Sequence, residues 1–324
     1  MRAARCEEYG GPGNVVIRDV PKPEAAAGQV VVDVAAAAVN YPDLLLIANR
    51  YQVSAPLPFT PGSEFSGRVA TVGEGVTGLL VGDLVYGSVF NGAMAEQVLV
   101  LARAIAPVPA GLSMVEAAAF RVTYLTAYHS LVTAGGVRPG EWVVVLGAAG
   151  GVGTATVDVA VRLGARVIAA ASSPERLTVC AELGAEAGID YVREDLKRRI
   201  RDIAGEGADL VIDPVGDRWA EAALRAIRWG GRFVTVGYAG GDISKIPLNV
   251  ILLKNITVRG VELRTWGERL PAETARAGAA LTDLVAQGMR PFVSEVHELT
   301  DVGTALRRVA DRAATGKVVI RVAP

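Results

Sequence analysis

The sequence contains few of the residues on which metal sites and disulfide-stabilised folds depend. Among 324 residues there are two cysteines, Cys6 and Cys180, and two histidines, His129 and His297. Two cysteines so far apart in the sequence form neither a disulfide framework nor a four-thiolate metal site. A catalytic zinc needs about three protein ligands of N, S or O type. Because neither histidine has a cysteine near it in the sequence, we expect no metal.

The chain also lacks a dominant charge and long apolar runs. Its net charge of −1 gives no electrostatic reason to expect nucleic acid or an anionic membrane as a partner. No apolar run reaches the roughly 18 residues that span a bilayer, and the first ten residues do not form a signal peptide. Aromatic residues make up 6%, whereas Ala, Val and Gly are abundant, which is typical of a helix-and-strand enzyme core. We therefore expect a cytoplasmic protein, long enough for two domains.

A short aliphatic run followed by glycines organises the second half of the chain. Val143–Leu146 is typical of a strand buried on both faces, and the segment from Gly151 to Gly164 has apolar residues at helical spacing. A strand, a glycine turn and a helix in this order point backbone N–H groups and the positive helix end at a phosphate. The glycines let the backbone approach a pyrophosphate. We predict a dinucleotide-binding turn at Gly150–Gly153, with a tight turn that binds nothing as the alternative.

The next strand indicates which dinucleotide is bound. Arg166–Ala171 ends in Ser172, Ser173, Pro174, Glu175 and Arg176, without the acidic residue that normally accepts from the ribose 2′-hydroxyl. Two hydroxyls and a cation suit a 2′-phosphate better than a free hydroxyl. Glu175 follows a proline, where it more plausibly helps to start the next helix. This pattern favours NADPH over NADH.

Strands and helices alternate from about residue 141 to 262. Six strands with crossover helices predict a doubly wound parallel sheet, whose ligand binds beyond the carboxyl ends of the strands. The first hundred residues instead contain short strands separated by Gly- and Pro-bearing turns, which is typical of a partly open β-barrel. Residues 39–52 are unusually polar and aromatic for their surroundings. We expect helices over residues 112–134, with Ser113 and Glu116 as a capping box. We expect an α/β protein with one domain at 1–118 and 265–324, and a second at 119–264.

Several motifs carry a family resemblance that covers essentially the whole chain. They are YGGPGNVVIRDVPKP, AAAAVNYPD, PGSEFSGRV, GVTGLLVGDLV, VTYLTAYHSL, GAAGGVGTATVDVAVRLGA, ASSPERL, DYVRED, LVIDPVG and TGKVVI. With these motifs the sequence resembles the zinc-independent quinone oxidoreductase branch of the medium-chain dehydrogenase/reductase superfamily. The resemblance implies a GroES-like catalytic domain, a Rossmann domain that binds NADPH, an active site in the cleft between them, and a homodimer. It also supports the absence of zinc, because the zinc branch has a histidine where PGSE has Ser63.

The resemblance also implies catalytic residues. Asn40 is expected to face the nicotinamide ribose and the substrate, with Tyr41 on the acceptor pocket. Tyr51 matches a family tyrosine and is the candidate proton donor, while a packed loop aromatic is the alternative. Asp43 more plausibly holds the loop than transfers a proton. Thr126 is expected near the nicotinamide, unless its hydroxyl bonds its own helix backbone.

The remaining cofactor residues come from the same comparison and from the strand-end loops. Arg176 occupies the family's basic position, and Tyr191 matches a tyrosine after the third strand. Arg312 or Lys317 could supply a second cation, and either could equally be a surface charge. The expected cofactor-binding residues are Thr126, Gly150, Gly151, Val152, Gly153, Ser172, Ser173, Arg176, Tyr191, Val215, Gly237, Tyr238 and Arg312.

Departures from the family pattern leave the acceptor open. Phe120 and Arg121 stand where relatives often have Leu-Pro, and Met94 replaces a frequent tyrosine. Arg121 is either a pocket cation for an anionic substrate or an exposed helix-end charge. The leading hypothesis is an NADPH-dependent reductase of quinones or similar conjugated carbonyl compounds. An enoyl-thioester or enone reductase and a non-catalytic NADPH-binding protein are the alternatives.

Overall fold

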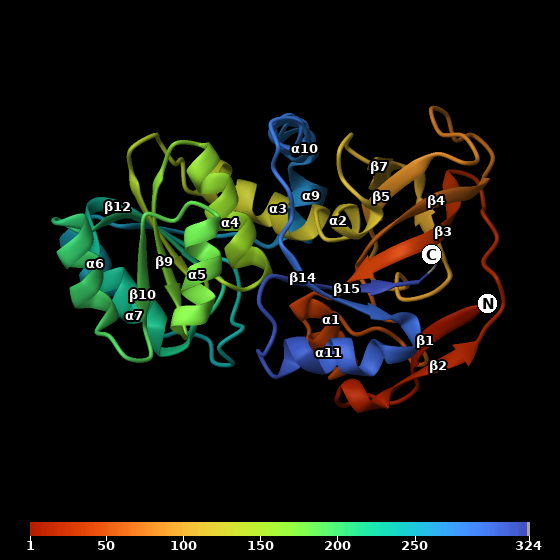
Figure 1. Cartoon of the computed structure of the whole chain (residues 1–324), viewed down its shortest axis with the longest axis horizontal. Helices are drawn as coiled ribbons and strands as arrows, with labels where there is room; N and C mark the ends of the chain where they lie inside the picture. Colours follow the sequence, from red (N-terminus) through yellow and green to blue (C-terminus); the bar gives the residue numbers. More distant parts are fainter. Residues whose placement is uncertain (323–324) are drawn as a thin grey trace. The chain divides into compact units, whose positions relative to one another are not determined.

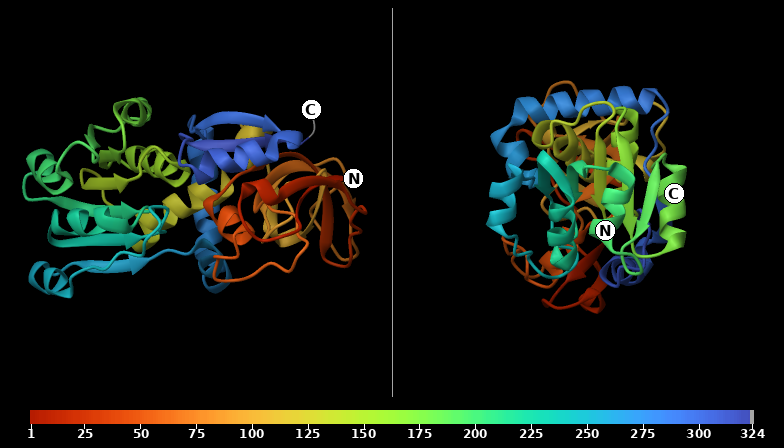
Figure 2. Two further views of the ribbon diagram at one scale, coloured as in Figure 1. Left: turned by 90° about the horizontal axis from the view of Figure 1, so that it is seen from below. Right: turned by 90° about the vertical axis from the view of Figure 1, so that its left-hand side faces the viewer.

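The computed structural model describes residues 1–322 and divides the chain into two compact units (Figure 1). The first unit is Met1–Val122 together with the described chain from Arg290 onward, and the second is Thr123–Met289. β1 and β15, near the two ends of the described chain, therefore both belong to the first unit (Figure 2). The two units meet after Val122 and after Met289. The expected boundaries lie after residues 118 and 264. The later return to the first unit follows from helices α9 and α10, which contact each other and stay with the second unit.

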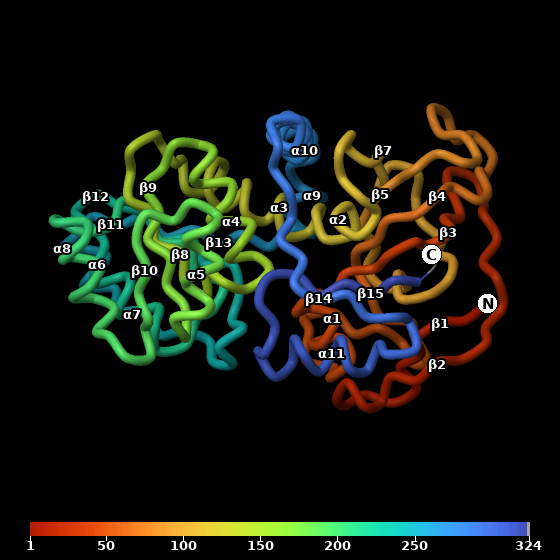
Figure 3. The backbone as a smooth tube through the Cα atoms, in the orientation of Figure 1, coloured from red at the N-terminus to blue at the C-terminus, as the bar shows by residue number. Residues whose placement is uncertain are grey.

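The second unit is built on a six-stranded parallel sheet in the order β10–β9–β8–β11–β12–β13. Figure 3 labels these six strands on the backbone. Its strands are β8 (Trp142–Leu146), β9 (Arg166–Ala171), β10 (Ala187–Asp190), β11 (Ala208–Asp213), β12 (Ile227–Thr235) and β13 (Thr257–Gly260). Its helices are most of α3 (Arg121–Tyr128), a π-helical turn at His129–Ala134, α4 (Gly151–Arg162), α5 (Pro174–Glu182), α6 (Leu196–Ala204), α7 (Asp217–Arg225), α8 (Leu248–Lys254), α9 (Leu263–Arg269) and α10 (Pro271–Ala286). The predicted doubly wound sheet of six strands is confirmed. Strands β9 and β10 lie on one side of β8, and strands β11 to β13 lie on the other. Sheets of this kind bind ligands at the point between β8 and β11 where the strand order changes side.

The first unit is built on an antiparallel-rich sheet of seven strands and a separate β1–β2 hairpin. Its strands are β1 (Arg2–Cys6), β2 (Val15–Asp19), β3 (Gln29–Ala38), β4 (Glu64–Val72), β5 (Leu84–Ser88), β6 (Gln97–Leu101), β7 (Ile105–Pro107), β14 (Val293–Glu298) and β15 (Lys317–Arg321). Its helices are α1 (Tyr41–Ile47), α2 (Met114–Ala118) and α11 (Val302–Ala310), with short 3₁₀ turns at Pro12–Asn14, Ala102–Ala104 and Leu299–Asp301. The sheet order is β14–β15–β3–β4–β5–β7, and β6 also pairs with β3. The predicted GroES-like, barrel-type architecture is confirmed.

Each unit has its own apolar core. In the first unit, alternate residues of β3 such as Val30, Val32 and Val34 pack with Phe65 and with Leu306 of α11. In the second unit the central strand β8 is buried on both faces, since residues 143 to 146 have no exposed surface. A strand with two covered faces needs a continuous apolar run, which is the pattern from which it was predicted.

In the first unit, one helix was not expected. The segment around Asp43, expected to be a loop, belongs to α1, which begins at Tyr41 with Pro42 in its first turn. Proline is favoured at that place because its missing N–H has no intrahelical partner there. The capping box of Ser113 and Glu116 at α2 is confirmed, with Ser113 Oγ accepting from Glu116 N at 3.3 Å.

Candidate functional site

The turn between β8 and α4 has no room for side chains. A Cβ atom on Gly153 would lie 2.2 Å from the carbonyl oxygen of Gly147, which is a backbone clash. Gly147 has φ of +56°, a left-handed conformation that favours glycine. Gly150 is the N-cap of α4, so no capping side chain accepts from the N–H groups of the first turn. The predicted dinucleotide turn therefore has the bare backbone that a pyrophosphate requires.

The loops that follow β11 and β12 lie against this turn. A Cβ on Gly147 would meet the Val215 side chain at 2.6 Å, so Val215 lies directly beside the glycine turn. Asp213 holds the β11 loop, because its carboxylate accepts from Val215 N at 2.9 Å and Gly216 N at 2.7 Å. Burial raises the pKa of Asp213, and these two N–H groups oppose the rise. The loop is fixed by a buried side chain and not by the turn residues alone.

The β12 loop completes this edge of the sheet. Gly237 N donates to the carbonyl of Asp213 at 3.4 Å, and a Cβ on Gly237 would lie 3.6 Å from the Pro214 oxygen. A Cβ on Gly216 would meet the Tyr238 ring at 2.8 Å, so that ring covers Gly216. The structure thus brings Gly150–Gly153, Val215, Gly237 and Tyr238 to the carboxyl ends of neighbouring strands.

The segment predicted to bind a 2′-phosphate lies at the carboxyl end of β9. Ser172 is exposed and Arg176 is half-buried in α5. Tyr191 N donates to the carbonyl of Ala171 at 3.1 Å, which places Tyr191 next to this segment, and its ring packs against Trp219 at 4.6 Å between centroids. Glu175 lies in the first turn of α5, where a carboxylate is favoured. A hydrogen bond from Ser173 lowers the pKa of Glu175, so Ser173 already has a partner within the segment.

In the first unit, the chain before α1 carries a buried amide. Asn40 is the N-cap of α1 and is 6% exposed. Its backbone N–H donates to Asp43 Oδ2 at 2.8 Å. Its side-chain Nδ2 donates to Glu64 Oε2 at 3.1 Å and faces Ser63 Oγ at 3.5 Å, while Oδ1 accepts from Lys317 Nζ at 2.7 Å. The amide is therefore held in one orientation, with the Ser63 contact as its longest.

Lys317 and Glu64 form a buried ion pair around this amide. Lys317 Nζ lies 3.3 Å from Glu64 Oε2 and donates to the Val39 carbonyl at 3.2 Å. The side chains are 4% and 0% exposed. Glu64 Oε1 accepts from Val122 N at 2.7 Å, so both carboxylate oxygens have donors. Of the two alternatives for Lys317, a cofactor cation or a surface charge, the structure excludes the surface charge. β15 places its ammonium inside the first unit among three acceptors.

Asp43 is the second buried carboxyl of this group. Burial raises its pKa to about 6, although the Asn40 N–H and the Lys317 charge both act to lower it. Its Oδ1 is buried without a well-formed hydrogen bond among residues 1–322. The other oxygen, Oδ2, accepts from Asn40 N and so holds the first turn of α1. This contact agrees with a role of Asp43 in shaping the segment.

The other predicted residues lie in three places. Tyr41 is the first residue of α1, and both Tyr41 and Tyr51 are partly buried against the core of the first unit. Thr126 is 6% exposed within α3 of the second unit, where its carbonyl accepts from Ser130 Oγ at 2.7 Å. Arg312 lies in the first unit, exposed and with φ of +55°. The other expected cofactor residues all belong to the second unit. The structure of the first unit therefore places none of them beside Arg312.

A metal ion does not fit the residues around Asn40. Within the described chain, no group of three His, Cys, Asp or Glu side chains lies together as a metal site would require. Glu64 would be the nearest acidic ligand, but its oxygens already accept from Val122, Asn40 and Lys317. An ammonium 3.3 Å from the carboxylate also repels a second cation.

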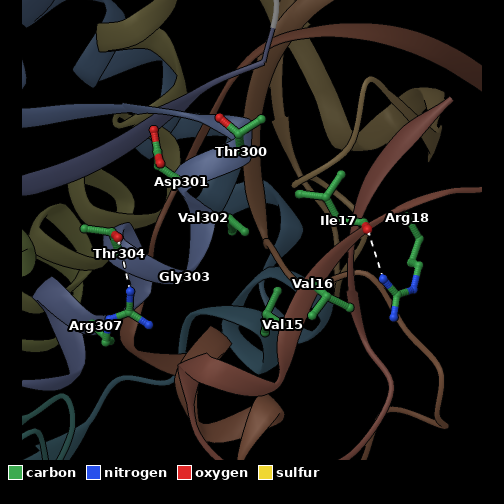
Figure 4. Close-up of a pocket in the computed structure, with 10 residues that line it drawn as sticks. All are labelled: Val15, Val16, Ile17, Arg18, Thr300, Asp301, Val302, Gly303, Thr304 and Arg307. Atoms are coloured by element: carbon green, nitrogen blue, oxygen red, sulfur yellow. Dashed lines mark hydrogen bonds between the residues drawn. The ribbon is translucent and has the colours of Figure 1, made fainter.

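A shallow hollow elsewhere on the first unit contains none of the predicted site residues (Figure 4). It is lined by Val15–Arg18 and by residues between Thr300 and Arg307. Arg307 donates to Thr304 Oγ1 at 3.2 Å, and Arg18 pairs with Glu7 at 2.9 Å, so both cations have partners. We assign the hollow no function.

No helix in residues 1–322 is both long and apolar enough to cross a membrane.

The comparisons with known proteins agree with both halves of this architecture. Residues 26–110 match the alcohol dehydrogenase GroES-like domain family, and residues 151–279 match the family described as zinc-binding dehydrogenase. These two domains in one chain define an oxidoreductase of the medium-chain dehydrogenase/reductase type. The bovine (Bos taurus) quinone oxidoreductase-like protein 2 is 37% identical over 325 residues, covering 98% of this chain and 92% of that protein.

Solved structures narrow the assignment. A quinone oxidoreductase from Thermus thermophilus, also solved with NADPH, is 37% identical with a TM-score of 0.87, covering 99% of this chain and 100% of that chain. The Escherichia coli quinone oxidoreductase complexed with NADPH is 26% identical with a TM-score of 0.93, over 99% and 100% of the two chains. The chain belongs to the quinone oxidoreductase branch of the medium-chain dehydrogenase/reductase superfamily.

Sequence reasoning missed two residues of this site. The PGSE motif indicated no role for Glu64, and Lys317 was expected only as a second cofactor cation or a surface charge. The available signal was their type and burial: an acid at the start of an apolar strand and a lysine before Val318 are costly unless they pair.

Proposed function

We propose that this protein is an NADPH-dependent oxidoreductase that transfers a hydride to a quinone or a similar conjugated carbonyl acceptor without a metal. The observation that carries the proposal is the Asn40–Glu64–Lys317 network, which puts a fixed amide and an ammonium where a metal would need free ligands. The NADPH complexes of the E. coli and T. thermophilus quinone oxidoreductases support the choice of cofactor.

The residues of the second unit would hold NADPH by its phosphates. The side-chain-free turn at Gly150–Gly153 suits the pyrophosphate, and Val215, Gly237 and Tyr238 border it. Ser172 and Arg176 suit the 2′-phosphate, for which Ser173 would exchange its bond to Glu175. Tyr191 packs against Trp219 beside that segment, and Thr126 and Arg312 remain proposed contacts.

The residues of the first unit would orient the acceptor and supply a proton. When bound, NADPH supplies the hydride, and negative charge then develops on the acceptor oxygen. Asn40 can offer one amide N–H by giving up its long contact with Ser63 at 3.5 Å, while Lys317 keeps Oδ1 fixed. We assign Tyr41 to the acceptor pocket and Tyr51 to proton donation, which returns a neutral product.

We further propose a homodimer formed along the β13 edge of the second unit. β13 is an edge strand whose four residues are all exposed, and an open edge pairs readily with a second chain. The neighbouring helix α8 exposes Leu248, Leu252 and Leu253 at 75%, 80% and 73%. Light scattering of the wild-type chain and of Leu252→Glu tests this, since a monomer in both would contradict it.

The test of the proposed function is NADPH oxidation against a panel of small quinones and short enoyl thioesters, with NADH in parallel. Turnover of quinones with NADPH preferred, unchanged by a chelator, is the expected result. Turnover confined to enoyl thioesters would reassign the protein to thioester reduction. Tight NADPH binding without oxidation by any acceptor would contradict an enzymatic function.

A further inference from the structure

Arg121 lies beside the buried network of the first unit. In the β4–β5 pairing, Glu64 is directly opposite Ser88, and Ser66 is opposite Tyr86. Side chains at opposed positions of antiparallel strands, and those two residues apart, point to the same face of a sheet. Arg121 Nε donates to Ser88 Oγ at 3.3 Å, and a second hydrogen bond joins Arg121 to Tyr86. The guanidinium is thus anchored on the face that carries Glu64.

The charge of Arg121 is not needed to neutralise Glu64. That carboxylate already accepts from Val122 N, Asn40 Nδ2 and Lys317 Nζ, at 2.7, 3.1 and 3.3 Å. The partners of Arg121 within the described chain are two hydroxyl groups, and it takes part in no ion pair there. A guanidinium has five N–H donors, so these two contacts leave donors available for another oxygen ligand.

A role in stabilising the helix does not explain the residue either. Arg121 is the first residue of α3, at the positive end of the helix dipole. A cation at that end is unfavourable, whereas a carboxylate would be favourable. The side chain is half-buried, so its charge is also partly removed from water. Neither the helix dipole nor the partial burial therefore favours a cation at this place.

We propose that Arg121 binds an anionic group of the acceptor, so that the protein prefers quinones or enones that carry a carboxylate, sulfonate or phosphate. This inference rests on the proposed function, because it assigns a substrate class to the same site. A guanidinium suits these groups because its planar fork matches two oxygens at once. Arg121 is linked to Asn40 through Val122 and Glu64, whose contacts measure 2.7 and 3.1 Å. The anion would therefore bind close to the amide assigned to the acceptor.

The experiment compares acceptors that differ in charge but not in size. The NADPH-loaded enzyme is assayed with an enone carboxylic acid and its primary amide, and with a naphthoquinone sulfonate and its sulfonamide. Arg121→Met should raise KM for the two anions by about ten- to a hundredfold and change the neutral partners by less than about twofold. Arg121→Lys should recover part of the loss. Arg103→Met, which removes an exposed cation of the same unit, should leave KM unchanged for the anionic and the neutral acceptors.

The outcomes separate this inference from the proposed function. Equal KM values for anion and neutral partner, unchanged in Arg121→Met, would overturn the role of Arg121 and leave the function standing. If no acceptor is reduced, the proposed function fails, and binding of naphthalene sulfonate to the NADPH complex decides on Arg121 alone. Calorimetry should then show at least about tenfold weaker binding to Arg121→Met, and equal affinity would overturn the inference.

Discussion

Replacing Asp43 by asparagine is expected to remove a pH-dependent loss of stability from the first unit. Asp43 is 0% exposed, and burial raises its pKa from 3.8 to about 6. Between these values the folded protein keeps a proton that the unfolded chain has released. The free energy of unfolding therefore falls as the pH rises through this window, and the loss is complete above the folded-state pKa. Below the unfolded value the carboxyl is neutral in both states and costs nothing.

The size of the effect follows from the separation of the two pKa values. Each unit corresponds to about 1.4 kcal/mol, so a difference of about two units costs about 3 kcal/mol at pH 8. About 2 kcal/mol of this is lost between pH 4 and pH 8. Asparagine keeps the size of the side chain, and its Oδ1 can accept the 2.8 Å bond from Asn40 N without ionising. The stability of Asp43→Asn relative to the wild type should therefore increase by that amount from pH 4 to pH 8.

The assay must report on the first unit. All four tryptophans, Trp142, Trp219, Trp229 and Trp266, lie in the second unit, so their fluorescence does not follow unfolding of the first. Denaturant unfolding followed by far-ultraviolet circular dichroism, or calorimetry, at several pH values is suitable. Asp19→Asn removes an exposed carboxylate of the same unit and serves as the control. A constant difference between Asp43→Asn and the wild type from pH 4 to pH 8 would refute the reasoning.

Three further predictions concern the proposed site. Gly153→Ala should weaken NADPH binding by at least about tenfold in a fluorescence titration, because its Cβ would clash with the Gly147 oxygen. Gly278→Ala, where the added Cβ meets no other atom, should bind NADPH normally. Equal affinities of the two variants would contradict the turn assignment. Arg176→Ala should weaken NADPH at least about tenfold more than NADH, since NADH lacks the phosphate partner, and an equal loss would argue against the 2′-phosphate site. Tyr51→Phe should lower kcat more than cofactor affinity, and an unchanged kcat would show that no protein acid is needed.

The second unit could be predicted because its signals are local. Val143–Leu146 is apolar at every position, and the glycines follow within a few residues, so strand, turn and helix are visible in one short window. The predicted strand Arg166–Ala171 coincides with β9. The site residues of this unit follow from the same rule, because parallel strands end at one edge of the sheet.

The first unit was harder to predict because its interactions are distant in sequence. Helix α1 was missed since Asn40, Pro42 and Asp43 look like turn residues, and its stability depends on packing against the core. The burial of Lys317 depends on Asn40 and Glu64, which lie 277 and 253 residues earlier. No local pattern reports a partner at that distance. The role of the amide was expected by resemblance, but the network that fixes it was not.

The discontinuity of the first unit has a consequence for biosynthesis. Glu64 leaves the ribosome 253 residues before Lys317, which at typical elongation rates of about 5–20 residues per second is a delay of roughly 13 to 50 s. During that time β3 lacks its neighbour β15 at Ala36–Ala38, and the carboxylate of Glu64 lacks its ammonium. The second unit, complete once Met289 is made, is free to fold first. We therefore expect residues Met1–Val122 to stay exposed to chaperones longer than the second unit, although they are synthesised before it.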